Sequence, residues 1–164
     1  MVAGIGTLAV SFHGGATLPG INNVYAFSHG KPGRVMLGAP NAPDPGLMPA
    51  LSELRSFVAS SDGSYLFVAN GSKERSQVVR FTAGARGEPP WVFHDVYASD
   101  GLAHPFDLVH GFDGSLFVSN QDTNAVTCHA SAGRRRPSPP GSARSVGWPS
   151  TERTCTWPTS APTR

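Results

Sequence analysis

The feature that most constrains this chain is an internal repeat with a spacing of 50 to 51 residues. The tripeptide Asp62–Ser64 recurs as Asp113–Ser115, and the tetrapeptide Phe67–Asn70 recurs with one change as Phe117–Asn120. A repeat of this length without helical periodicity is typical of β-sheet units that stack on one another. A chain of 164 residues has room for only a few such units.

Hydrophobic alternation and turn residues divide the repeat unit into four short strands. We expect these strands at 55–59, 65–69, 78–82 and 91–97. Asp62-Gly63 is expected to form the first hairpin turn, because glycine adopts positive φ and aspartate bonds its own backbone. The sequence therefore predicts an all-β fold, a partial β-propeller of four-stranded antiparallel blades. Each blade has two apolar faces and needs a neighbour on both sides.

A fainter copy of the unit precedes the two clear ones. Residues 8–12 take the place of the second strand, residues 22–27 match 76–81, and residues 34–37 are expected to form the outer strand. This copy lacks a segment for an innermost strand. We therefore expect about two and a half blades within residues 1–133. Their bounds are predicted at 6–38, 51–98 and 102–133.

These units resemble the NHL-repeat type of β-propeller over roughly residues 6–133. The resemblance rests on a hydrophobic strand, Asp-Gly, Leu-Phe-Val-Ser-Asn, a polar turn and Asn-x-Val. It implies a ring, usually six-bladed, whose inner strands line a central channel and whose ligands bind at the channel mouth. The family includes gluconolactonase-like and peptidyl-amidating-lyase-like enzymes as well as binding scaffolds.

The chain is too short for such a ring, which needs at least about four blades. We therefore expect a truncated piece with uncovered sheet faces and edges. Such a piece is predicted to be marginally stable as a monomer, or to self-associate through its uncovered blades.

Residues 134–164 differ in composition from the rest of the chain. They hold six of the 13 basic and one of the 11 acidic residues, so they carry +5 while residues 1–133 carry −3. They contain no Leu, Ile, Phe or Met, so they cannot bury enough apolar surface to offset the loss of chain entropy. We predict a disordered, Arg/Pro/Ser/Thr-rich tail. No groove-reading helix or aromatic platform accompanies Arg134–Arg136, so no nucleic-acid partner is expected.

The codons of this tail suggest a shifted reading frame. Trp148-Pro149 and Trp157-Pro158 both require TGG CCN, which yields alanine when it is read from the third base. The shifted frame permits Leu-Ala-Val-Asp-Gly-x-Asp-Leu-Tyr-Val-Ala-Asp, which is the start of another repeat unit. We hypothesise that the residues from 127–134 onward are out of frame relative to a propeller ancestor.

Three residues are candidates for a ligand-binding site at the channel mouth. His104 leads into the inner strand of the last unit, and Glu53 is its equivalent when both are counted back from Asp-Gly. Asp107 lies in the same inner strand and is equivalent to Ser56. In the functional interpretation, Glu53 and His104 face one cavity, and Asp107 binds a cation or a hydroxylated ligand. In the structural interpretation, the first two are solvated loop residues, and neighbouring backbone N–H groups satisfy Asp107.

Other motifs with known chemistry are missing. The sequence has no Gly-x-Ser-x-Gly elbow and no phosphate-binding loop, and none of its six histidines has metal-ligand spacing. Cys128 is expected in the place of Phe81 as a small core residue, and with Cys155 it makes no disulfide framework.

We therefore predict a non-enzymatic propeller fragment with no evident cofactor. It would be a binding or scaffold module for a small molecule or protein at the channel mouth, or a truncated piece without function of its own. The alternative is a remnant of a metal-dependent propeller hydrolase or lyase, gluconolactonase-like or amidating-lyase-like, with a divalent cation held by several blades.

Targeting signals give no strong prediction of compartment. Residues 2–12 are apolar but lack a basic start, so we expect no signal peptide there. No segment approaches the ~18 apolar residues of a membrane span. No membrane partner is predicted, and a cytoplasmic location is the default expectation.

Overall fold

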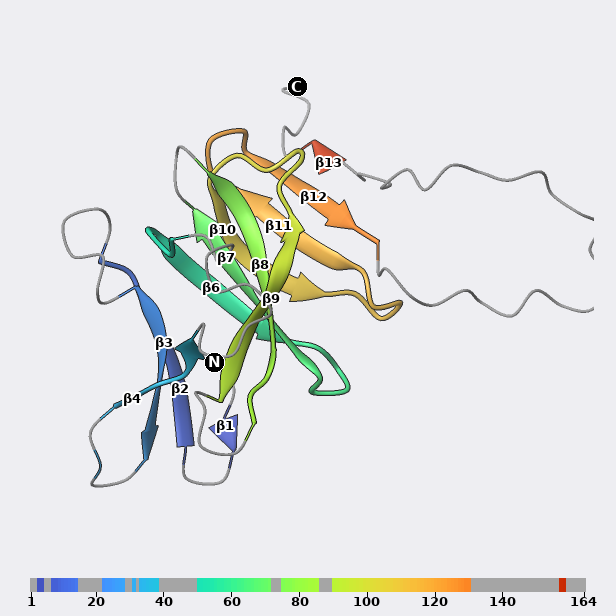
Figure 1. The fold of residues 1–164 in the computed structure, drawn as a ribbon. Helices are drawn as coiled ribbons and strands as arrows, with labels where there is room; N and C mark the ends of the chain where they lie inside the picture. The colour runs from blue at the N-terminus through green and yellow to red at the C-terminus, as the bar shows by residue number, and fades with distance from the viewer. Residues whose placement is uncertain are drawn as a thin grey trace, which may run out of the picture.

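The structure is a computed structural model in which the described residues form β-strands and no helix. The described residues are 3–4, 7–14, 22–28, 31, 33–38, 50–71, 75–85, 90–130 and 157–158. None of them belongs to a helix that is long and apolar enough to span a membrane. The predicted all-β class is confirmed. Three sheets lie beside one another, as the blue, green and orange parts of Figure 1 show.

The first sheet is an antiparallel meander near the N-terminus. It contains β1 (Ala3–Gly4), β2 (Thr7–Phe12), β3 (Asn23–Ser28) and β4 (Arg34–Val35), in that order. The prediction that this unit lacks an innermost strand is wrong, because β1 pairs antiparallel with the start of β2. The missed strand is only two residues long, which is too short to give a hydrophobic alternation in the sequence.

The central sheet contains the four strands that the repeat predicts. They are β6 (Leu54–Ala59), β7 (Tyr65–Gly71), β8 (Ser76–Ala83) and β9 (Trp91–Ala98), paired in chain order. A short strand β5 (Leu37–Gly38) adds to this sheet parallel to β9. The sequence placed Leu37 in the outer strand of the first unit, but the structure buries its side chain in the core shared by the first two sheets.

The third sheet contains β10 (Pro105–His110), β11 (Leu116–Asn120), β12 (Ala125–His129) and β13 (Trp157–Pro158). β13 lies within the tail that the sequence predicts to be disordered, and it pairs antiparallel with Ala125 and Val126. Two residues of the predicted tail therefore form a short strand. The rest of 134–164, including Arg134–Arg136, lies outside the described residues.

The two Asp-Gly turns have the predicted construction. Asp62 accepts hydrogen bonds from the Ser60 hydroxyl and the Ser64 backbone N–H, and Gly63 has a φ of 72°. Asp113 accepts two hydrogen bonds from Ser115 in the same way. These bonds stabilise the charged carboxylates and hold the pKa of both Asp62 and Asp113 below the ordinary value.

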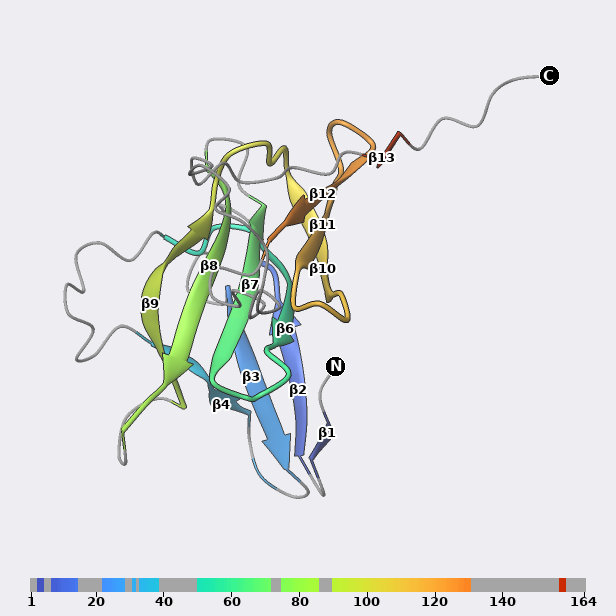
Figure 2. The same cartoon turned by 90° about the vertical axis from the view of Figure 1, so that its right-hand side faces the viewer.

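The central sheet is apolar on both faces, and each face packs against a neighbouring sheet. Leu66 and Val68 alternate along β7 with Phe67 and Ala69. The first pair lies in a core shared with Ala9 and Val24 of the first sheet. The second pair lies in a core shared with Leu108, Leu116 and Val118 of the third sheet. Figure 2 shows the same arrangement from another side, with β10 beside β6 and β7.

The sheets stack in the same sense. Leu116 and Val118 of the third sheet are the repeat equivalents of Leu66 and Val68, and they face the central sheet as Leu66 and Val68 face the first. The remaining two faces, at the ends of the stack, have no neighbouring sheet among the described residues. We call them the first outer face and the third outer face. The first carries Leu8, Val10, Phe12, Tyr25 and Phe27, and the third carries Val109, Phe117 and Val126.

Candidate functional site

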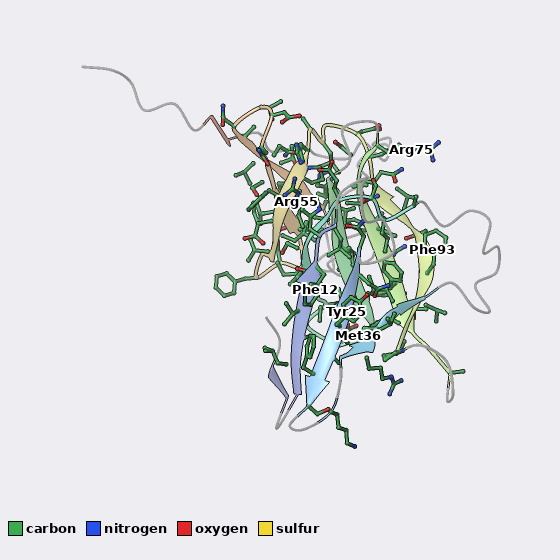
Figure 3. The ribbon with its side chains drawn as sticks, turned by 90° about the vertical axis from the view of Figure 1, so that its left-hand side faces the viewer. Phe12, Tyr25, Met36, Arg55, Arg75 and Phe93 are labelled. Carbon is green, nitrogen blue, oxygen red and sulfur yellow. The ribbon has the colours of Figure 1, made fainter. Side chains whose placement is uncertain are left out.

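A polar cluster lies where the central and third sheets meet, beside their edge strands β6 and β10. Arg55 of β6 places Nη2 3.1 Å from Oε2 of Glu53 and 3.0 Å from Nε2 of His104. The Glu53 Oε2 atom also lies 3.1 Å from His104 Nε2. Figure 3 shows Arg55 beside the strands of the third sheet. In the functional interpretation of the sequence Glu53 and His104 face one cavity, and the structure places the two side chains in contact.

Equivalent hydrogen bonds hold Glu53 and His104 in equivalent places. The Glu53 carbonyl accepts from the Gly71 N–H at 2.8 Å, and the His104 carbonyl accepts from the Gln121 N–H at 3.0 Å. The Asn70 side chain accepts from the Glu53 N–H and from that of Ser52. Asn120 accepts from the Ala103 N–H. The two strand-ending asparagines therefore brace the segments that carry the cluster.

His104 is held tightly, and its side chain is buried. Its φ of 56° lies in the left-handed region, which is uncommon for a residue other than glycine. Its backbone N–H donates to the Ser76 hydroxyl at 2.8 Å. A Cβ at Gly71 would come within 2.9 Å of the His104 ring, so only glycine fits there without movement. The expectation that Glu53 and His104 are solvated loop residues is therefore wrong for His104.

The two contacts of His104 Nε2 use opposite roles of that nitrogen. As an acceptor, Nε2 bonds the Arg55 guanidinium, which carries donors only, and as a donor it bonds Oε2 of Glu53. The other ring nitrogen, Nδ1, lies 3.3 Å from Oδ1 of Asp122. The Arg55 guanidinium also lies over the Phe106 ring at 5.7 Å. These groups pair with one another and link the two sheets.

Asp107 forms a second, separate link between the same sheets. Its Oδ1 atom accepts a hydrogen bond of 2.7 Å from the Ser56 hydroxyl and another of 2.9 Å from the Leu108 N–H. Its own N–H donates to the Ser119 hydroxyl. The sequence identified Asp107 and Ser56 as equivalent residues, and the structure brings them into contact. The Leu108 bond agrees with the structural interpretation of Asp107, in which backbone N–H groups satisfy the carboxylate.

Two members of the cluster were missed by sequence reasoning. Arg55 lies two residues after Glu53, at the start of a predicted inner strand, which is a signal that could have identified it. Asp122 lies in the turn after β11.

One assignment in the third sheet also needs correction. The structure pairs Leu66 with Phe81 and Leu116 with His129, so His129 takes the place of Phe81. Cys128 instead pairs with Phe117, as Arg80 pairs with Phe67. Cys128 is buried as expected, but it occupies the neighbouring register position. Cys155 lies outside the described residues.

The described residues contain no group of three or more His, Cys, Asp and Glu side chains that could hold a metal ion. An apolar hollow of about 400 Å³ lies on the first outer face, lined by Phe12, Tyr25, Phe27 and Gly33. Figure 3 labels Phe12 and Tyr25 on the first sheet. Sequence reasoning did not identify this hollow, whose lining comes from the paired strands β2 and β3 and from Gly33 just before β4.

Comparison with models of known protein families, with curated proteins and with solved structures found no match to this chain.

Proposed function

We propose that this chain is a piece of a β-propeller of the NHL-repeat type, and that it serves as a non-enzymatic binding or scaffold module. The observation that carries the proposal is the stacking of three meander sheets in the same sense, each apolar face against the next. That packing is the one by which propeller blades cover one another. In such a piece the sheets would be blades, and β6 and β10 would be inner strands beside the channel.

The polar cluster supports a binding or scaffold role over catalysis. Arg55 contacts both Glu53 and His104, and Ser56 contacts Asp107. In this arrangement Arg55 Nη2 contacts both Oε2 of Glu53 and Nε2 of His104, so these two atoms are engaged by a neighbouring side chain rather than available to a substrate. The exposed Asp107 carboxylate is the group best placed to contact a hydroxylated small molecule or a protein at the channel mouth.

Calorimetric titration with Ca²⁺, Mg²⁺ and Zn²⁺ tests the non-enzymatic part of the proposal. We expect no stoichiometric binding to the wild-type chain. Binding of one ion per chain that disappears in both Glu53→Gln and Asp107→Asn would contradict the proposal and favour the metal-dependent hydrolase or lyase. Asp100→Asn, at an exposed aspartate elsewhere on the chain, is the matched control.

Translation of the encoding DNA in all three frames tests whether the chain is a piece of a longer propeller. We expect the shifted frame to stay open beyond codon 164 and to encode further Asp-Gly units of about 50 residues. The function would then belong to the restored protein. A shifted frame closed by stop codons would contradict the frameshift hypothesis, and the tail would be a native extension.

A further inference from the structure

We propose that two copies of this chain assemble head to tail into one closed ring, with the third outer face of each copy covering the first outer face of the other. This inference rests on the proposed function, because it treats the three sheets as propeller blades. It goes further by naming the partner as a second copy of the chain.

The two outer faces are different and complementary. Leu8 and Val10 take the places that Leu66 and Val68 have in the central sheet. Tyr25 and Phe27 take the places of Val79 and Phe81, which lie with Leu66 and Val68 in the core against the first sheet. The first outer face is therefore the kind of face that receives a preceding sheet.

The third outer face is of the opposite kind. Val109 and Phe117 are paired on it, as Val58 and Phe67 are paired in the central sheet. Phe67 and Val58 pack against the third sheet, so this is the kind of face that covers a following sheet. The same two kinds of face meet at both junctions inside the chain. The third outer face of one copy therefore fits the first outer face of a second copy. Two first outer faces, or two third outer faces, do not fit each other in this way.

Both outer faces leave apolar surface exposed. Phe12 is 39% and Val109 is 59% exposed. The Phe12 ring packs edge-to-face on Tyr25, with ring centroids 5.2 Å apart, beside the apolar hollow. Contiguous apolar surface of this kind marks an interaction site in a soluble protein.

Head-to-tail contacts form a closed ring when the rotation from one copy to the next closes, and an open fibre when it does not. Propellers close with about four to eight blades. Each chain supplies three sheets, so two copies supply six, whereas one copy falls short of this range and three copies exceed it. Two copies are therefore the number of chains that forms a closed ring.

The oligomeric state of the full chain tests the proposal. Light scattering during gel filtration, repeated over a range of protein concentrations, should give twice the 17.2 kDa chain mass. Phe12→Asp and Val109→Lys place a charge on the first and third outer faces, respectively. Each variant alone should raise the dimer dissociation constant by about 100-fold, because both junctions then bury an unpaired charge. Phe112→Asp, at a fully exposed turn residue, is the matched control and should remain dimeric.

Mixing the two variants tests the head-to-tail arrangement. A mixed dimer has one junction without substitutions and one with opposite charges, so the equimolar mixture should recover the dimer. Failure to recover would overturn the proposal, as would a wild-type monomer, an assembly larger than two, or a dimer that neither variant weakens. Circular dichroism identifies any variant that does not fold. Val109→Lys keeps the test valid if Phe12→Asp unfolds, because Val109 is the more exposed of the two.

The failure of this proposal is distinguishable from failure of the proposed function. Two results together would overturn only the ring. The wild-type chain would be a monomer, and the variant with Ser56→Cys and Asp107→Cys would still form a disulfide between its central and third sheets, which retains the blade interpretation.

Discussion

Burial of both faces of the central sheet can be tested by replacing one phenylalanine on each face with alanine. Phe81 is fully buried against the first sheet, where its ring lies 6.3 Å from that of Phe93. Phe67 is 6% exposed on the opposite face, where its ring lies 4.9 Å from that of Tyr97. Replacing a buried phenylalanine by alanine costs about 3–5 kcal/mol through lost transfer free energy and the cavity that remains. We expect Phe81→Ala and Phe67→Ala each to lower the free energy of unfolding by this amount.

Urea denaturation followed by circular dichroism at one protein concentration measures the effect. With a slope of about 2 kcal/mol per molar urea, each variant should lower the midpoint by about 2 M. Phe112→Ala is the matched control, because the same deletion at an exposed turn residue should change the free energy of unfolding by less than about 0.5 kcal/mol.

Two results would refute this reasoning in different ways. If Phe67→Ala behaves like Phe112→Ala while Phe81→Ala is strongly destabilising, the central sheet is buried on one face only, and the fold is a two-sheet sandwich. If both core variants behave like the control, the sheets do not pack as described. Either result removes the support for blades.

Two further predictions concern the polar cluster and the turns. Gly71→Ala should lower the free energy of unfolding by about 1–3 kcal/mol, because a Cβ would press on the His104 ring and the backbone beside it. Thermal melts measure this loss, and an unchanged melting temperature would contradict the tight fit. The lowered pKa values of Asp62 and Asp113 predict stabilisation that is present above the ordinary carboxyl pKa and is lost as the pH falls through the lowered one. The urea midpoint of Asp62→Asn/Asp113→Asn should therefore depend less on pH below about 4 than that of wild type, while Asp100→Asn should keep the wild-type profile.

The spacing of the repeat was sufficient to identify equivalent residues in the second and third units. Because Asp62-Gly63 and Asp113-Gly114 mark the same turn, counting back from them identified Glu53 and His104 as equivalents. The structure brings these two into contact through neighbouring strands that share one register. These equivalences could be read from the sequence because a hairpin turn fixes the register of the two strands that flank it.

Residues beyond a turn of variable length were harder to place. Residues 71–76 separate the paired Asn70 and Gln77 in the central sheet, whereas only residues 121–124 separate the paired Asn120 and Ala125 in the third sheet. Counting across this turn therefore misplaced Cys128 by one register position. The parallel pairing of Leu37 with Trp91 joins two segments that are far apart in the chain, which no local pattern encodes. The contact between Arg55 and His104 likewise depends on how two sheets stack.

The central claim is that the second and third units stack as neighbouring blades, and trapping a disulfide between them tests it most directly. In a Cys128→Ala/Cys155→Ser background, Ser56→Cys and Asp107→Cys place thiols on two side chains whose oxygens are 2.7 Å apart. The account predicts an intramolecular disulfide on mild oxidation, seen by mass spectrometry and by faster migration on a non-reducing gel. The control pair, Ser56→Cys with Phe112→Cys, should stay reduced. A reduced 56–107 pair, or one that forms as readily as the control, would contradict the stacking of the two sheets.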